Sequence, residues 1–285
     1  MERHDGYFAP DGVAWRVGRE TALLLGGGRA LLLQVAHPLV AAGVAAHSDY
    51  RENPWRRLEQ TMSTVWTVIY GTRSEADAAV SRVRAVHERV RGRIAAPMGP
   101  FAEGTRYSAL DPELLLWVHA TLIDTALLVY RSWVGPLSDA EQRAYYEEMK
   151  TMALLFGTPE ELIPSTLDDF RIYTRERLAS DRISVTETAL QIAATVLDPP
   201  LPLPLRPAMK ALALVTVAML PPRLRADYGF HWSRSRAALV GASRRWTRHV
   251  LMPLLPDLVR AVGASRRAEG RRGIGIDLGV ILPSR

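Results

Sequence analysis

The stretch DPELLLWVHATLIDTAL, from Asp111 to Leu127, decides the fold class of this chain. Asp111-Pro112 is typical of a helix start, since proline fits the first helical position, and the residues that follow are apolar on nearly every side. A helix without a polar face has to be surrounded by other elements. We therefore expect a central helix that runs to about Trp133, in which Asp124 and Thr125 are buried polar groups that need partners.

The sequence on either side of this helix also has mostly helical apolar spacing, and no run alternates in the manner of a strand. A break is expected near His37-Pro38, because proline disfavours helix at the residue before it. The stretch DPPLPLPLRP, Asp198 to Pro207, has five prolines in ten residues and predicts an extended connector. The other helices are expected at approximately Thr21–Val35, Ala41–His47, Trp55–Tyr70, Ser74–Gly92, Asp139–Phe156, Thr166–Leu178, Thr186–Val196, Ala208–Leu220 and Ser233–Leu251. Ser74 is expected to cap the fourth of these helices, and Ser138 to start the fifth.

This pattern predicts an all-α fold in which residues 1–264 form a single helical domain, with the connector 198–207 inside it. The formal net charge is +6, and residues 265–285 hold five arginines against two acidic residues. That end of the chain is expected to be a basic, flexible tail. No aromatic residues are interleaved with its arginines, which gives little support to nucleic-acid binding.

The composition excludes several kinds of chemistry. The 285 residues include no cysteine, so disulfides, thiolate nucleophiles and cysteine metal sites are absent. The N-terminal MERHDGYFAP has no apolar core of the kind a secretory signal needs. The segments Ala30–Ala46 and Ala208–Leu220 are too polar or too short for the roughly 20 residues of a membrane span. A cytoplasmic protein is expected, and these segments and the basic tail leave room for peripheral membrane contact.

The familiar catalytic motifs are missing as well. The chain has no GxSxG elbow, no phosphate-binding loop, no HExxH, and no repeated ExxH pair of the di-iron type. The glycine-rich GGGRA, Gly26 to Ala30, follows a helix and not a strand, so it is very weak evidence of dinucleotide binding.

The stretch VRAVHERVRG, Val83 to Gly92, places one histidine among valines and arginines. On the expected helix His87 lies four residues after Val83 and three before Val90, on the inward stripe. In isolation this pattern favours a hydrogen-bonded core histidine over a ligand. His119, on the central helix, has a similar setting.

A polar ridge is expected on the helix Trp55–Tyr70. Arg57, Gln60, Thr61 and Thr64 share one of its faces, at spacings of three and four residues, and on composition alone such a ridge faces solvent. An all-α chain with inward histidines and no thiolate is compatible with haem, whose iron can take one histidine and leave its other face open.

The sequence resembles a known family, the bacterial proteins grouped with the latex-clearing protein and the fungal MpaB-type oxygenase. Four stretches occur in the family's order, a fifth resembles its C-terminal signature, and the resemblance covers about Ala14 to Leu255. The five stretches are LLLQVAHPLVAAGVAAHSDY, PWRRLEQTMSTVWTVIYGT, VRAVHERVRG, DPELLLWVHATLIDTAL and LPPRLRADYGF.

The resemblance implies a mostly helical protein with a globin-like core that binds one b-type haem. It places the family's axial histidine at His87 and a supporting histidine at His119, which is the fallback iron ligand. The family's distal arginine and threonine match Arg57 and Thr61. Gln60 stands where the latex-clearing protein has a lysine that can cap the iron, and an amide supplies no amine ligand. The lysine-capped resting state and the substrate therefore do not carry over.

We expect a haem b-dependent oxygenase that uses O₂ to cleave or otherwise oxidise a hydrophobic, unsaturated or isoprenoid-like substrate. Arg57 would place positive charge near bound oxygen or a haem propionate, and Gln60 and Thr61 would donate hydrogen bonds there. Apolar walls are expected from the helices that hold Val65, Ile69 and Leu122.

Two alternatives remain open. One is a haem oxidase or peroxidase of a small metabolite. The other is a haem-free helical protein that binds a lipid, in which both histidines are core residues and the ridge faces water. The sequence leaves open the substrate, the oligomeric state and the role of the basic tail.

Overall fold

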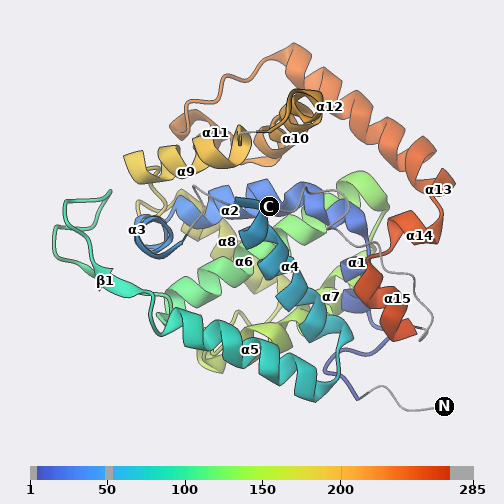
Figure 1. Ribbon diagram of the computed structural model, residues 1–285, viewed down its shortest axis with the longest axis horizontal. Helices are drawn as coiled ribbons and strands as arrows, with labels where there is room; N and C mark the ends of the chain where they lie inside the picture. The colour runs from blue at the N-terminus through green and yellow to red at the C-terminus, as the bar shows by residue number, and fades with distance from the viewer. Residues whose placement is uncertain (1–4, 49–53, 200, 270–285) are drawn as a thin grey trace.

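The computed structural model describes the chain except for residues 1–4, 49–53, 200 and 270–285. The structure is 71% helical and forms a single all-α domain, which confirms the predicted fold class. Figure 1 shows the helices packed in layers around α6, with α10 to α12 on one side and α5 on the other. The elements, in chain order, are α1 (Val13–Gly18), η1 (Thr21–Gly26), α2 (Gly27–Val35), α3 (Pro38–His47), α4 (Pro54–Tyr70), α5 (Arg73–His87), β1 (Arg91–Arg93), β2 (Arg106–Ser108), α6 (Pro112–Val129), η2 (Tyr130–Val134), α7 (Asp139–Leu155), η3 (Glu160–Leu162), α8 (Leu167–Ala179), α9 (Glu187–Leu197), η4 (Leu203–Leu205), α10 (Arg206–Met219), α11 (Pro222–Asp227), α12 (Arg234–Trp246), η5 (Thr247–Leu251), α13 (Met252–Leu254), α14 (Asp257–Arg260) and α15 (Gly263–Glu269).

The helix α6 is the central element, as its apolar sequence predicts. The side chain of Asp111 caps it by accepting hydrogen bonds from the backbone N–H groups of Glu113, at 2.9 Å, and Leu114, at 3.3 Å. The helix continues through one π-helical segment, η2, so that Pro112–Val134 is long and apolar enough to cross a membrane, with a mean hydropathy of 1.4. However, 61% of its apolar window is buried by the rest of the protein. It is therefore the core helix of this domain.

Two polar groups of α6, the half-buried Asp124 and the buried Thr125, find their partner on α2. Arg29, whose side chain is 5% exposed, donates from Nη2 to Asp124 Oδ2 at 2.6 Å and from Nη1 to the hydroxyl of Thr125. Its Nε donates to the backbone oxygen of Met219, at the end of α10. One arginine thus satisfies both groups that the sequence identified as needing partners, and it joins three helices.

The glycine run before Arg29 allows this close packing. A methyl group at Gly26 would lie 2.5 Å from Thr125 Cγ2, and one at Gly28 would lie 2.6 Å from Thr216 Oγ1. A larger residue at either position would push α2 away from α6 or α10. The expected break at His37-Pro38 is present, because the axis of the segment Thr21–Val35 turns by 108° into α3.

The helices α4 and α5 form an antiparallel hairpin that turns at Gly71. Thr72 caps α5, since its hydroxyl accepts from the backbone N–H of Glu75 while the carboxylate of Glu75 accepts from the N–H of Thr72. The expectation that Ser74 caps this helix was therefore wrong. The expected end at Gly92 was also wrong, because α5 ends at His87.

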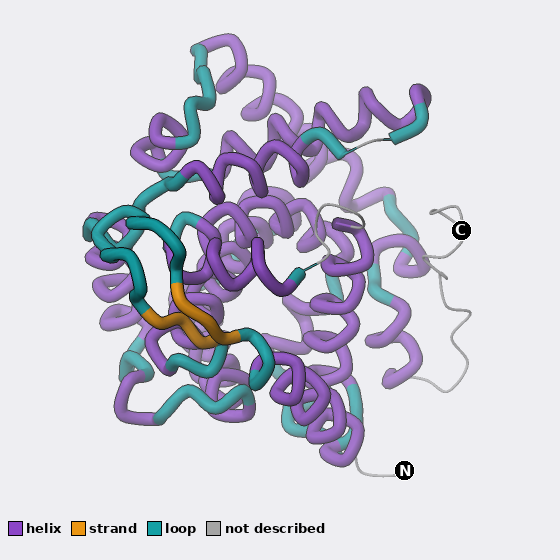
Figure 2. Tube along the Cα trace, turned by 60° about the vertical axis from the view of Figure 1, so that its left-hand side comes forward, coloured by secondary structure: helices purple, strands orange, loops and turns teal. Residues whose placement is uncertain are grey.

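After α5 the chain forms a short sheet that the sequence did not predict. In this antiparallel pair Arg91 lies opposite Ser108 and Arg93 opposite Arg106, and the hairpin projects from the edge of the helical body (Figure 2). Side chains alternate over only three residues in each strand, which is too short for a periodic signal.

The proline-rich connector and the C-terminal segments close the fold. The connector contains η4, and α10 begins at Arg206, inside the segment expected to be extended. Near the C-terminus, Arg260 pairs with the buried carboxylate of Glu20 at 2.9 Å. The helix α15 includes residues 265–269, the first residues of the expected basic tail, and Ser265 is fully buried. The rest of that tail lies outside the described residues.

Candidate functional site

The first candidate, His87, is the last residue of α5, at the open end of the hairpin. Figure 1 shows α4 and α5 diverging from their common turn. Near that turn, residues of both helices are buried, such as Ile69 of α4 and Ala76 of α5. At the far end of α5, His87 is half-buried and Val86 is 49% exposed. His87 therefore lies at the less buried end of α5, and its role as an iron ligand stays a prediction.

The predicted polar ridge lies on α4, in the half of that helix farther from the turn. In the described part of the ridge Gln60 and Thr61 are exposed to solvent, and the hydroxyl of Thr64 donates to the backbone oxygen of Gln60 at 2.9 Å. The backbone of Arg57 belongs to the first turn of α4, and its side chain lies outside the described residues. The roles assigned to Arg57, Gln60 and Thr61 stay predictions.

The second candidate, His119, is a fully enclosed imidazole on α6. The residue is 8% exposed, and its Nε2 is buried without a hydrogen-bond partner in the described structure. Burial lowers the pKa of His119 to about 4, although a hydrogen bond with the backbone of Met149 on α7 opposes this shift. The imidazole is therefore neutral at pH 7, and one of its nitrogens keeps an unused lone pair.

A cavity of about 130 Å³ lies beside this part of α6. Its walls come from α2, α4, α6, α9 and α10, and they are mainly apolar, with Leu31, Leu58, Met62 and Leu122 among them. Leu122 follows His119 by three residues on α6, so the two backbone positions lie about one turn apart, but His119 itself does not line the cavity. The polar atoms on the wall belong to Gln34, Thr61 and Thr216.

The cavity brings together some of the residues that the sequence singled out and separates others. Thr61 and Leu122 both line it. Val65 and Ile69, which were expected in an apolar wall beside Leu122, instead pack into the core between α1, α4 and α6. Neither His87 nor His119 is among the lining residues. The α4 helix therefore contributes to the cavity through Leu58 and Met62, one to two turns before the expected positions.

The histidine at the helix break, His37, is a buried structural residue. Its ring packs against Phe101, with the ring centroids 5.5 Å apart, and burial is the main cause that lowers its pKa to about 4. The carbonyl freed at the break, that of Ala36, accepts from the backbone N–H of Ser184 at 2.8 Å. The Nδ1 of His37 is buried and has no hydrogen-bond partner in the described structure.

The side chain available in this region, a buried histidine, is of the type that binds a haem iron. A metal-binding histidine uses one ring nitrogen and is usually oriented through the other, and His119 has that arrangement, with Met149 as its orienting partner. The part of the chain that the structure describes contains no group of three or more acidic or histidine side chains placed to hold a metal ion. A haem iron needs only one protein ligand, so a single imidazole meets the requirement.

Sequence reasoning missed Arg29 and Gln34, both on α2. Arg29 is the single charged residue in the apolar run from Gly26 to Val35, which is the signal that could have paired it with Asp124. Gln34 donates from its side-chain amide to the hydroxyl of Thr121 at 3.1 Å, and this bond fixes one of the polar groups on the cavity wall.

The comparisons with known proteins identify the class to which this fold and site belong. Residues 15–249 match the family described as the catalytic domain of the ER-bound oxygenase MpaB and of rubber oxygenase. The match covers α2 to α12, with both candidate histidines and the cavity. This chain belongs to that oxygenase family.

The curated relatives carry no assigned activity. The uncharacterised proteins Rv2237 of Mycobacterium tuberculosis and Mb2261 of Mycobacterium bovis are each 27% identical to this chain over 213 residues, which is 72% of this chain and 80% of theirs. No solved structure matches the chain significantly.

Proposed function

We propose that this protein is a haem b-dependent oxygenase that acts with O₂ on a small apolar, unsaturated substrate of the isoprenoid type. The membership in the oxygenase family is the observation that carries the proposal. The buried, neutral imidazole of His119 supports it, because no group in the described fold uses its Nε2.

The roles of the histidines follow from their positions. His87 would bind the iron from the end of α5, and His119 would support the group from α6 or replace His87 as the ligand. When bound, haem b would supply the activation of dioxygen, which no side chain of this cysteine-free protein supplies. The protein would contribute binding, orientation and the exclusion of water.

The substrate would lie in the apolar cavity. Its volume of about 130 Å³ is below the usual range of roughly 300–1,000 Å³ for ligand pockets, which favours a narrow chain over a bulky ring system. The hydroxyl of Thr61, on the cavity wall, would donate a hydrogen bond toward the place where dioxygen would bind. Gln60 and Arg57 would lie beside it on α4. Cleavage of a carbon–carbon double bond by one O₂ gives two carbonyl products, so each oxygen atom ends in one product.

The test of the cofactor is a comparison of histidine variants. The full chain is expressed with added iron and haem precursor, and its visible spectrum and pyridine haemochrome are measured. We expect a Soret band of haem b that is lost in His87→Ala and kept in His231→Ala, the control with an exposed histidine in a loop. Loss in His119→Ala alone would move the ligand to His119. A folded, colourless wild type would refute the proposal and favour a lipid-binding protein.

The reaction is tested by isotope labelling of the products and by a variant that fills the cavity. Turnover of a short isoprenoid alcohol under ¹⁸O₂ should label both carbonyl products, and Leu122→Trp, which fills the cavity, should abolish turnover while the Soret band remains. Turnover driven by peroxide but not by dioxygen would contradict the oxygenase reaction and indicate a peroxidase. Unchanged turnover in Leu122→Trp would show that the substrate binds elsewhere.

A further inference from the structure

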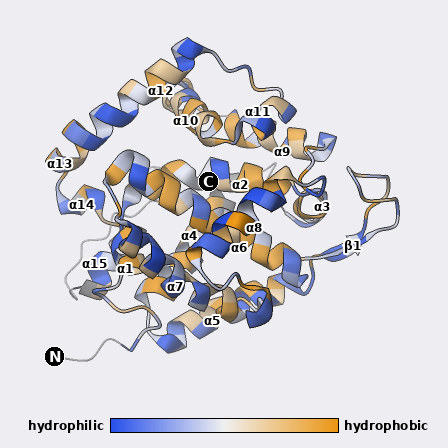
Figure 3. Cartoon of the chain, turned by 180° about the vertical axis from the view of Figure 1, so that it is seen from behind, coloured by the Kyte–Doolittle hydropathy of each residue, from blue (hydrophilic) through white to orange (hydrophobic). Residues whose placement is uncertain are grey.

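A second surface, remote from the histidines in the sequence, has a marked chemistry of its own. The segment from Arg234 to Leu254, which comprises α12, η5 and α13, forms an outer ridge of the molecule (Figures 1 and 3). Between Ser233 and Pro256 the sequence has five arginines and one histidine but no acidic residue. We call this segment the basic ridge.

The basic ridge exposes a stripe of large apolar side chains. Leu239 is 60% exposed, Trp246 56%, Val250 42% and Leu254 76%. They are separated by seven, four and four residues, so they share one face of the helix. The opposite face packs inward, because Met252 is buried and Thr247 and Leu251 are half-buried. No described part of the chain covers this stripe.

An arginine-lined cleft opens beside the stripe. It has a volume of about 480 Å³ and is lined by Arg244, Arg245, Arg248 and His249 of the basic ridge and by Arg131 of η2. No carboxylate of the described residues pairs with any of these four arginines; Arg248 donates only to the backbone oxygen of Arg131, at 3.3 Å. The cleft therefore concentrates positive charge that the fold does not neutralise.

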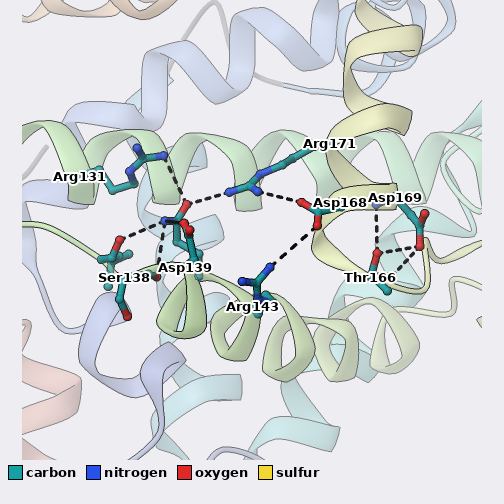
Figure 4. A network of polar contacts seen from close by, with 10 residues as sticks. Arg131, Ser138, Asp139, Arg143, Thr166, Asp168, Asp169 and Arg171 are labelled. Atoms are coloured by element: carbon teal, nitrogen blue, oxygen red, sulfur yellow. Dashed lines mark hydrogen bonds and ion pairs between the residues drawn. The ribbon is translucent and has the colours of Figure 1, made fainter.

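The far wall of the cleft is held in place by a polar network. Arg131 donates to the side-chain oxygen of Gln142 at 3.3 Å, and Arg171 donates to the same oxygen at 3.0 Å. Arg171 also pairs with Asp168 at 2.9 Å, and Arg143 approaches the other oxygen of that carboxylate (Figure 4). Gln142 is 3% exposed, so the position of Arg131 is set by buried contacts.

We propose that the basic ridge is a docking surface for an anionic phospholipid bilayer. Lipid phosphates would enter the arginine cleft, and the apolar stripe would enter the boundary between headgroups and acyl chains. Helices that lie in a membrane interface combine these two features, and basic side chains near an anionic leaflet gain about 1 kcal/mol each. Three of the four stripe residues are aliphatic, which suits lipid and offers no stacking platform to nucleic acid. The inference does not rest on the proposed haem chemistry.

The test is sedimentation of the full chain with vesicles. Binding is compared between vesicles of phosphatidylcholine alone and vesicles that also contain phosphatidylglycerol, at low and high salt. We expect strong binding only to the anionic vesicles, weakened by salt. The variant Arg244→Ser/Arg245→Ser/Arg248→Ser should bind on the order of 100-fold more weakly, which corresponds to about fivefold for each arginine.

Matched variants distinguish the effect of this surface from the effect of exposed arginines and exposed apolar residues elsewhere on the protein. Arg82→Ser/Arg106→Ser/Arg175→Ser removes three exposed arginines elsewhere and should bind normally. Trp246→Ser/Leu254→Ser should lose binding, whereas Leu162→Ser/Ile172→Ser, at positions 40% and 45% exposed, should not. Equal loss in the matched pairs would overturn the proposal.

Three further measurements test which occupant the basic ridge takes. Quenching of tryptophan fluorescence by brominated lipids should be lost largely in Trp246→Phe, although the chain has seven tryptophans. Tight binding of inorganic phosphate without vesicle binding would show a site for a soluble anion and overturn the docking surface. A dimer that Trp246→Ser/Leu254→Ser dissociates, again without vesicle binding, would assign the stripe to a second copy of the chain.

Discussion

Acidification from pH 7 to pH 5 should destabilise this protein through its buried imidazoles. Burial lowers the pKa of both His119 and His37 from 6.5 to about 4. Because the folded-state pKa is below the unfolded one, the unfolded chain takes up the proton first. The stability that each neutral imidazole supports is therefore present above pH 6.5 and lost as the pH falls toward 4.

The magnitude follows from the shift. A difference of one pKa unit corresponds to about 1.4 kcal/mol. Relative to pH 7, protonation of His119 in the unfolded chain should therefore lower the free energy of unfolding by about 2 kcal/mol at pH 5 and about 3 kcal/mol near pH 4. His37 should contribute a similar amount. Urea unfolding followed by circular dichroism measures the free energy at each pH, provided that the m-value stays constant.

The controls are single substitutions. His119→Leu should remove about half of the loss between pH 7 and pH 5, and His37→Leu a similar share, whereas His231→Leu, at an exposed loop position, should leave the profile of the wild type. If His119→Leu keeps the full pH dependence of the wild type, the imidazole of His119 is not buried in its neutral form and the reasoning about its unused nitrogen fails.

Three further predictions concern the packing around α6, and the free energy of unfolding by denaturant checks each of them. Arg29→Met should cost about 1–3 kcal/mol, because it removes the partner of the half-buried Asp124 and the hydrogen bonds to Thr125 and to the backbone of Met219; a cost no larger than that of a surface substitution would contradict this role of Arg29. Gly28→Ala should cost about 1–3 kcal/mol, and Thr216→Ala in the same chain should recover part of it, since the added methyl would meet the Thr216 side chain. Asp111→Ala should cost about 1 kcal/mol through the loss of its cap; no loss would show that the cap contributes nothing.

The sequence predicted those parts of the fold that depend on short-range patterns. The central helix followed from apolar residues on all of its sides, and the helix start at Ser138 was correct because the Ser138 side chain satisfies a backbone N–H group three residues later. The cap of α5 also had a local signal, the spacing of Thr72 and Glu75, although Ser74 was chosen instead.

The remaining features depend on residues far apart in the chain. The end of α5 at His87 is followed by a strand pair whose paired residues lie well apart in the chain, as Arg91 and Ser108 show. Arg29 meets Asp124 across 95 positions. Periodicity identified the helix face on which His87 and His119 lie, but it could not tell that the first is half-buried at an open end and the second fully enclosed.

The visible spectrum of the purified full chain, taken before any substrate is added, tests the central claim most directly. We expect one haem b per chain, bound through an imidazole, with the Soret band abolished by His87→Ala while the helical circular dichroism spectrum is retained. A helical, fully folded protein that stays colourless when iron and haem precursor are abundant would contradict the account.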